Sequence, residues 1–228
     1  MKKILVVCLV IAIALVGASA AMATIAGSKH DLSATASGGT GTWYTGGLLS
    51  SCQYCHTPHH ANGTTAPLWN RTMVTAGYTT YGGGVTLSGT TVNQPGPNSQ
   101  TCLSCHDGTV AIGATISNGT GPLLVRAGVL TGGMIQASAA GYIGTNLGDD
   151  HPVGVVYRSN ATMAGLSNVV NATTYKINNQ EWKIYGGGDG VGRVECGSCH
   201  DPHTTDVTKF PFLKDTLISI CSDCHANK

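Results

Sequence analysis

The stretch Cys196-Gly197-Ser198-Cys199-His200-Asp201-Pro202-His203 decides how this chain folds. Two cysteines stand three positions apart, a histidine follows the second cysteine directly, and another histidine comes three residues later. The CxxCH part of this stretch is the attachment signature of c-type haem. The two thiols form thioethers with the haem, and the adjacent histidine becomes the proximal ligand of the iron.

The same signature occurs four times in the chain. Motif one is Cys52–His56, motif two is Cys102–His106, motif three is Cys196–His200 and motif four is Cys221–His225. Four copies predict four covalently attached haem c groups. The attaching residues are Cys52, Cys55, Cys102, Cys105, Cys196, Cys199, Cys221 and Cys224, and the proximal iron ligands are His56, His106, His200 and His225.

Other uses of paired cysteines explain this pattern less well. Zinc sites also contain CxxC pairs, but they do not require a histidine directly after the second cysteine in every copy. A thioredoxin-like site has one CxxC within a βαβ pattern, which this sequence lacks. Disulfides are common in exported chains, yet they leave the four histidines unexplained.

The first residues are typical of an export signal. Lys2 and Lys3 precede an apolar run from Ile4 to Val16, and small residues follow up to Ala23. This pattern predicts a signal peptide over residues 1–23 and no transmembrane anchor, because the apolar run is too short to span a bilayer. Cleavage after Ala23 removes Cys8, so every remaining cysteine belongs to a CxxCH motif.

Composition supports a single cofactor-rich domain over residues 24–228. Removal of 23 residues from 228 leaves 205, with 10 Lys and Arg against 11 Asp and Glu, a balance that argues against a nucleic-acid partner. The chain has 32 Gly and only two Phe, which predicts a weak conventional core. We therefore expect a mostly irregular, loop-rich domain organised around a stack of four haems, whose attachment drives folding.

Local patterns predict only a few short elements. Thr- and Gly-rich sequence, turn dipeptides and short apolar runs indicate small hairpins and two helices. Residues 24–51 are expected to form an extended arm in which Trp43 and Tyr44 are available to pack on a porphyrin. The predicted elements are hairpins within 85–92 and 175–185 and helices over 102–113 and 216–226.

Histidines outside the motifs are sufficient to supply every sixth ligand. His59 and His203 each lie three residues after a proximal histidine, too close to reach the opposite face of the same iron, so each is expected to serve a different haem. His60 matches no repeated position. The predicted distal ligands are His30, His59, His151 and His203, with His30 assigned to motif one, His151 to motif two and His203 to motif four. The alternative donors are Met73, Met134 and Met163.

Six segments of the sequence carry a resemblance to a known family. They are KHDLS at 29–33, CHTPH at 55–59, APLWNR at 66–71, CLSCHDGTVA at 102–111, DHPVG at 150–154 and CHDPH at 199–203. With these segments the chain resembles the multihaem c-type cytochromes, and more narrowly a tetrahaem group. Some relatives in metal-reducing microbes polymerise into extracellular cytochrome filaments, in which a histidine near the N-terminus ligates haem in the neighbouring subunit. The resemblance implies that His59 could serve motif three of another protomer.

Three functional classes follow from these patterns. The leading hypothesis is an electron-transfer protein and not an enzyme, either an extracellular or cell-surface filament subunit or a soluble periplasmic shuttle. Its partners would be redox proteins, extracellular electron acceptors and further copies of the chain. A multihaem reductase needs an open iron position, which four histidine-terminated motifs and a full set of distal histidines do not favour. The third class is a binding module with haem as a structural staple.

Overall fold

The computed structural model describes most of the chain after the predicted signal peptide. The predicted signal peptide, Trp43, Tyr44 and Met163 lie outside the described residues. All nine histidines and the eight motif cysteines lie within them. The described residues are 25, 28–33, 50–65, 67–73, 77–83, 86–87, 90–117, 129–157, 176–177, 180–186, 192–204 and 212–225.

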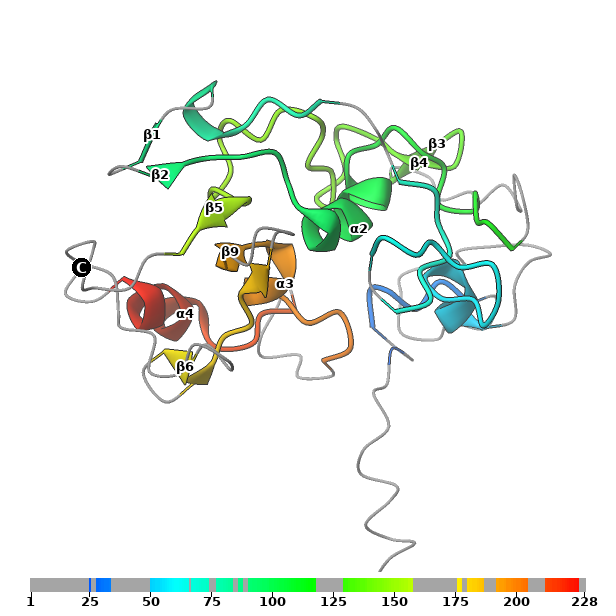
Figure 1. Ribbon diagram of the computed structural model, residues 1–228. Coiled ribbons are helices and arrows are strands. Elements are labelled where there is room, and N and C mark those ends of the chain that lie inside the picture. Colours follow the sequence, from blue (N-terminus) through cyan, green and yellow to red (C-terminus); the bar gives the residue numbers. More distant parts are fainter. Residues whose placement is uncertain are drawn as a thin grey trace, which may run out of the picture.

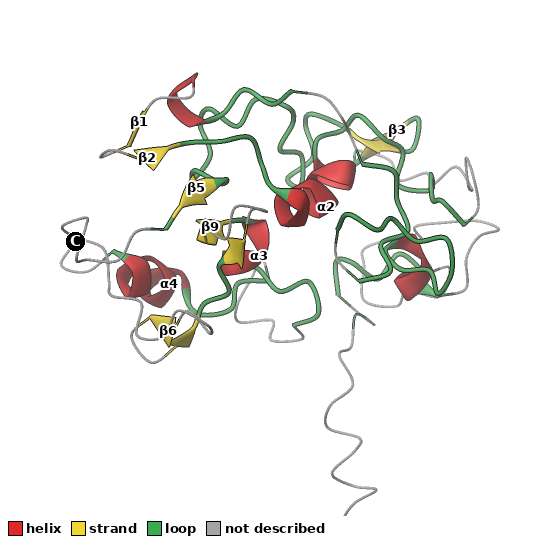
Figure 2. Ribbon diagram, in the orientation of Figure 1, coloured by secondary structure: helices red, strands yellow, loops and turns green. Residues whose placement is uncertain are grey.

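The described chain is mostly loop, as predicted, with short helices and two- or three-residue strands (Figure 1, Figure 2). The 3-10 helices are η2 (Ser51–Tyr54) and η3 (Tyr81–Gly83), and the α-helices are α2 (Pro97–His106), α3 (Cys196–Cys199) and α4 (Leu217–Cys224). The strands are β1 (Thr86–Leu87), β2 (Thr90–Thr91), β3 (Leu130–Thr131), β4 (Met134–Ile135), β5 (Val155–Val156), β6 (Lys176–Ile177), β7 (Gln180–Glu181), β8 (Tyr185–Gly186) and β9 (Gly192–Val194).

Antiparallel pairing joins these strands into four small sheets. Three are two-stranded: β1 with β2, β3 with β4, and β6 with β7. The hairpins predicted near residues 85–92 and 175–185 are confirmed by β1–β2 and β6–β7. The fourth sheet has the order β5-β9-β8, and Val155 pairs with Val194 across a long sequence separation. Sequence patterns did not predict this sheet because its pairings are not local.

Helix α2 begins earlier and ends earlier than predicted. It starts at Pro97, whose fixed backbone suits the first helical position. It ends at His106 because the Asp107 carboxylate accepts from the Thr109 amide at 2.9 Å and Gly108 then adopts φ +72°. A Cβ on Gly108 would lie 2.8 Å from the Ile135 carbonyl oxygen, so the turn requires glycine. The predicted helical stretch from Asp107 to residue 113 is therefore wrong.

Helix α4 lies within the predicted range 216–226. The Thr216 hydroxyl caps it by accepting from the Ser219 amide at 3.3 Å. One face buries Ile220 against Trp182 and Leu213, whereas Ile218 is 84 % exposed. The end of α4 carries motif four, so apolar packing of this helix positions the last CxxCH motif.

Among the described residues, three small apolar clusters form in place of a single large core. One gathers Leu32, Tyr54, Ile112, Leu130 and Ile135; the second is Trp182, Leu213 and Ile220; the third is Tyr78, Leu103 and Leu147. Motif cysteines pack at the edges of the first two clusters: Cys55, Cys105, Cys199 and Cys224. The motif cysteines therefore take part in the same apolar packing that holds the described chain together.

Candidate functional site

Each CxxCH motif lies on or at the end of a short helix. Motif one begins within η2 and ends two residues after it, motif two ends α2, motif three occupies α3, and motif four ends α4. Cysteines at positions i and i+3 of a helical turn lie on one face, which suits attachment of both to one haem. All eight cysteines in the described chain are free thiols. In the haem-loaded protein these sulfurs would be thioethers.

Three pairs of histidine rings lie at nearly the same separation. The ring centres of His30 and His106 are 6.0 Å apart, those of His56 and His203 are 6.3 Å apart, and those of His151 and His225 are 6.4 Å apart. In every pair one histidine belongs to a motif and the other does not. Three of the four predicted distal ligands are therefore each opposed to a proximal one.

This spacing fits an iron between two imidazoles. A metal–imidazole bond is about 2 Å long, so two imidazoles on opposite sides of one iron have ring centres roughly 6 Å apart. Within the described ranges, no group of three or more His, Cys, Asp or Glu is arranged to hold a metal ion. A haem iron takes only two ligands from the protein, and paired rings match that requirement.

Hydrogen bonds at Nδ1 orient several of these rings. His56 Nδ1 lies 2.9 Å from the Pro67 carbonyl oxygen, His106 Nδ1 lies 2.6 Å from that of Gly141, and His151 Nδ1 lies 3.1 Å from that of Pro152. His203 Nδ1 is 3.5 Å from the Asp201 carboxylate. Since these carbonyl oxygens can only accept, Nδ1 carries the proton and Nε2 is left free to bind iron, the usual arrangement for a ligating histidine.

Burial keeps two of the ring-paired histidines neutral. Burial lowers the pKa of His30 to about 4, and the nearby rings of His106 and His203 add to the effect. The Pro202 carbonyl, which accepts a hydrogen bond from the His30 ring, opposes it. Burial also lowers the pKa of His106. A neutral imidazole is the form that binds a metal, so these surroundings favour ligation.

The ring pairs differ from the assignment expected from chain order. His30 faces motif two and not motif one, His151 faces motif four and not motif two, and His203 faces motif one and not motif four. These ring pairs are the basis of the different assignment proposed below. They depart from chain order because the segment after motif three folds back toward motif one.

A turn after motif three produces this reversal. The Asp201 carboxylate accepts from the His203 amide at 2.9 Å, and the Thr204 amide donates to the Asp201 carbonyl at 3.1 Å. A bridge pairs His200 with Leu213, and the Asp201 amide donates to the Phe212 carbonyl at 2.8 Å. No sequence pattern indicates a role for Phe212, one of only two phenylalanines in the chain. Its ring stacks on His30 at 4.5 Å between centres.

A buried polar junction joins α2 to α3. The Glu195 carboxylate accepts from the Gly96 amide at 3.1 Å, from the Ser99 hydroxyl, and from the third residue of α3, Ser198. The Cys196 amide donates to the Ser99 hydroxyl at 2.9 Å. The thiols of motifs two and three meet here, since Cys102 and Cys196 form a side-chain hydrogen bond.

The segment after motif one clamps it to motif two. Arg71 is 1 % exposed and donates to the carbonyl oxygens of Ile112 at 2.6 Å and Ser104 at 2.8 Å. Asn70 donates to the Gln53 carbonyl at 2.6 Å. A buried guanidinium needs several acceptors, and these carbonyls supply them. Motif one is therefore fixed to α2 by side chains of the sequence APLWNR.

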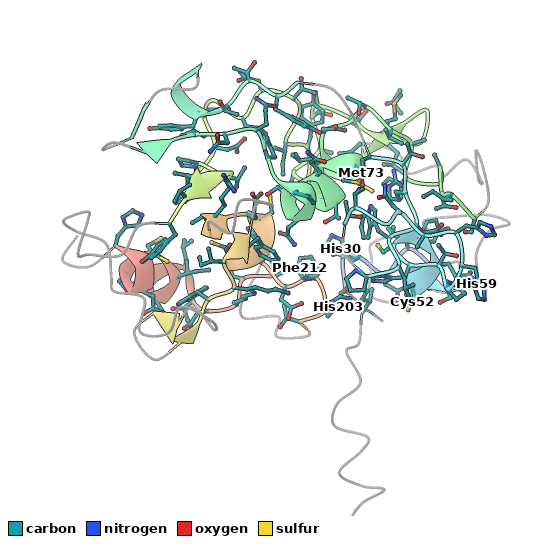
Figure 3. The ribbon with its side chains drawn as sticks, viewed as in Figure 1. His30, Cys52, His59, Met73, His203 and Phe212 are labelled. Atoms are coloured by element: carbon teal, nitrogen blue, oxygen red, sulfur yellow. The ribbon has the colours of Figure 1, made fainter. Side chains whose placement is uncertain are left out.

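The remaining predicted ligand, His59, lies at the periphery. His59 and His60 are both exposed, and His60 adopts φ 58°. Figure 3 shows His30, His203 and Phe212 close together between the motif-one and motif-three segments, with His59 on the outer side. Two of the alternative iron ligands, Met73 and Met134, lie within the described residues and are half-buried. The three ring pairs are formed by histidines and involve neither methionine.

Comparison with known proteins supports a haem protein. The family model described as a doubled CXXCH motif matches residues 190–228, which contain motifs three and four. The comparison with curated proteins found no match. The matched motif supports a multihaem c-type cytochrome with bound haem c and a role in electron transfer, a class that is generally not enzymatic. Among the described helices, none is long and apolar enough to cross a membrane.

Proposed function

We propose that this chain is an electron-transfer protein with four covalent haem c groups, each ligated by two histidines. The observation that carries the proposal is the set of three ring pairs, in which a motif histidine faces a non-motif histidine at 6.0 to 6.4 Å. Bound haem supplies one-electron redox chemistry at iron. The chain supplies the attachment thiols, the axial imidazoles and the hydrogen bonds that orient them.

The proposed ligand sets follow the ring pairs. The distal ligand is His203 for motif one, His30 for motif two and His151 for motif four. His59 is proposed for motif three, and His60 is the spare histidine. With both axial positions of every iron filled by imidazole, no position is left for a substrate, which supports a carrier over a reductase.

Close approach of the motifs supports rapid transfer between haems. The Cys102 and Cys196 thiols interact, which brings the attachment points of motifs two and three together. Charge on Cys105 affects the pKa of Cys55, and charge on Cys199 that of Cys224, so the other neighbouring motifs are also near one another. Attachment points this close support a continuous stack of four haems.

We further propose that the protein is exported and polymerises through His59. The predicted signal peptide and the near-neutral, Thr- and Asn-rich sequence support export to the cell surface or beyond. The exposed position of His59 on the outer side of motif one suits ligation in a neighbouring protomer. A head-to-tail contact of this kind does not close on itself and propagates into a filament. A soluble periplasmic shuttle is the second candidate.

Intact mass and carbon monoxide binding test the haem count and ligation. The mature protein should have the mass of the polypeptide plus four haems, with no free thiol. Carbon monoxide added to the reduced protein should at first leave the absorption spectrum nearly unchanged, because histidine occupies both axial positions and must leave an iron before carbon monoxide can bind. A mass with fewer haems, or rapid stoichiometric carbon monoxide binding at one haem, would contradict the proposal.

His59→Ala, with His60→Ala as its matched control, tests the polymer. His59→Ala should retain four haems but abolish filaments in electron micrographs and leave one high-spin iron per chain. His60→Ala should behave as the wild type. If the wild-type protein is a monomer in which all irons are already low-spin, ligation in trans is wrong and the periplasmic shuttle is the better assignment.

A further inference from the structure

We propose that Phe212 is a positioning residue that holds His30 on the motif-two iron. The rings of Phe212 and His30 are stacked with centres 4.5 Å apart and planes inclined by 3°. His30 in turn faces His106 at 6.0 Å. This inference rests on the proposed ligation of the motif-two iron by His30 and His106.

The stack fixes one face of the His30 ring. Parallel aromatic rings at this separation attract one another, and the contact restricts rotation of the imidazole. The Pro202 carbonyl accepts a hydrogen bond from the same ring. The stacked ring and the carbonyl together determine the direction of the ligating nitrogen. Partners of this kind keep a ligand oriented toward its metal.

The backbone of Phe212 shows that this position is tightly constrained. Phe212 adopts φ 63°, a left-handed conformation that is a genuine outlier for a bulky residue. Strained conformations persist where the surrounding structure determines them and cluster at functional sites. Here the Asp201 amide donates a hydrogen bond to the Phe212 carbonyl, and the Lys214 amide donates one to the Cys199 carbonyl at 2.9 Å. The strained turn directs the aromatic ring onto His30.

The same segment therefore serves two irons besides its own. His203, in the turn that contacts Phe212, faces His56 of motif one. Phe212 and Pro202 contact His30, which faces His106 of motif two. The chain around motif three thus provides one distal ligand and orients another. Weaker ligation of the motif-two iron by His30 should be observable separately from loss of His203 on the motif-one iron. Different side chains hold the two histidine rings.

The test uses paired variants of the holoprotein. Phe212→Gly removes the ring but suits the left-handed backbone, and Phe212→Tyr keeps the ring. If the Phe212→Gly protein does not accumulate in the host, Phe212→Asn replaces it, because asparagine also tolerates the left-handed conformation. Leu68→Gly is the matched control, because Leu68 has φ 60° and is 52 % exposed. The rate of carbon monoxide binding to the reduced protein reports how often a distal histidine leaves its iron.

Phe212→Gly should accelerate one carbon monoxide binding phase roughly two- to ten-fold, the change expected from loss of one aromatic stack. Phe212→Tyr and Leu68→Gly should leave all phases unchanged. In a His30→Ala background, which opens that haem outright, Phe212→Gly should have no further effect on that haem. Equal acceleration by the glycine and tyrosine variants, no acceleration by either, or an effect that persists without His30 would overturn the inference.

His30→Ala alone distinguishes this failure from failure of the proposed function. If His30→Ala leaves all four irons low-spin and closed to carbon monoxide, His30 is not a ligand and the proposed ligation is wrong. If His30→Ala opens one iron but Phe212→Gly behaves as wild type, only the role of Phe212 is wrong.

Discussion

The motifs on α2 and α3 are joined by buried polar contacts, whereas motif four on α4 is held mainly by apolar packing, with one hydrogen bond from the Trp182 indole to the Asp223 carboxylate at 3.2 Å. At the α2–α3 junction, the Glu195 carboxylate receives hydrogen bonds from both helices, and Gly197 leaves space for Asn98. In α4, Ile220 packs on Trp182 and Leu213 while Ile218 faces solvent. Directional bonds fix two helices to one another, but apolar packing allows more adjustment. The polar junction should define the spacing of motifs two and three.

Truncation of Glu195 should have the largest effect on stability. Glu195→Ala removes the acceptor for the Gly96 amide, the Ser99 hydroxyl and the Ser198 amide. Loss of this acceptor should lower the free energy of unfolding of the holoprotein by about 3 kcal/mol, since each orphaned buried group is costly. Unfolding by denaturant measures this change in the free energy of unfolding. A loss no greater than that of a surface variant would mean that the junction is not a determinant of stability.

Ile220→Ala should have the next largest effect, with Ile218→Ala as its matched control in the same helix. Ile220 is 7 % exposed and Ile218 is 84 % exposed. The buried substitution should cost roughly 2 kcal/mol, because it removes apolar contacts and leaves a cavity. The exposed one should change stability by less than about 0.5 kcal/mol. Equal effects in thermal unfolding of the two variants would show that α4 does not pack through Ile220.

Loss of the helix cap at Thr216 should be a smaller effect. Thr216→Ala removes the hydroxyl that accepts from the Ser219 amide at the start of α4. The expected cost is about 1 kcal/mol, and Thr216→Ser should restore it because serine caps equally well. Both variants can be compared by thermal unfolding of the holoprotein. Failure of serine to rescue would assign the effect to the lost methyl group.

The smallest expected effect is a pH dependence at the polar junction. Burial raises the pKa of Glu195, and the hydrogen bonds from Ser99 and Gly96 oppose this. The folded chain therefore binds the proton more tightly than the unfolded chain. The free energy of unfolding should fall as pH rises from the ordinary glutamate value through the folded one. Glu195→Gln should remove this decline, measured as the difference between wild type and variant from about pH 4 to 7. A difference that does not vary with pH would contradict the assignment.

Sequence predicted the loop-rich fold, the two local hairpins and helix α4, because these depend on neighbouring residues. It did not predict the β5-β9-β8 sheet or the opposition of His203 to His56, because both depend on how distant segments fold back. The early end of α2 at His106 reflects a turn at Asp107 and Gly108 that competes with the helix.

The candidate site was predictable in its chemistry but not in its connections. The CxxCH spacing predicts the attachment residues directly, and the histidine count predicts a sufficient pool of distal ligands. Which rings face one another depends on long-range packing. The roles of Glu195, Arg71 and Phe212 also depend on tertiary contacts, and no sequence pattern pointed to them.

A cryo-electron microscopy map of the purified holoprotein would test the proposed ligation most directly, because it shows the axial ligands of each iron. We expect four haems, with His56 and His203 on the motif-one iron, His106 and His30 on the motif-two iron, and His225 and His151 on the motif-four iron. An iron in any of these motifs with a different distal residue, or with an open sixth position, would contradict the proposed ligation.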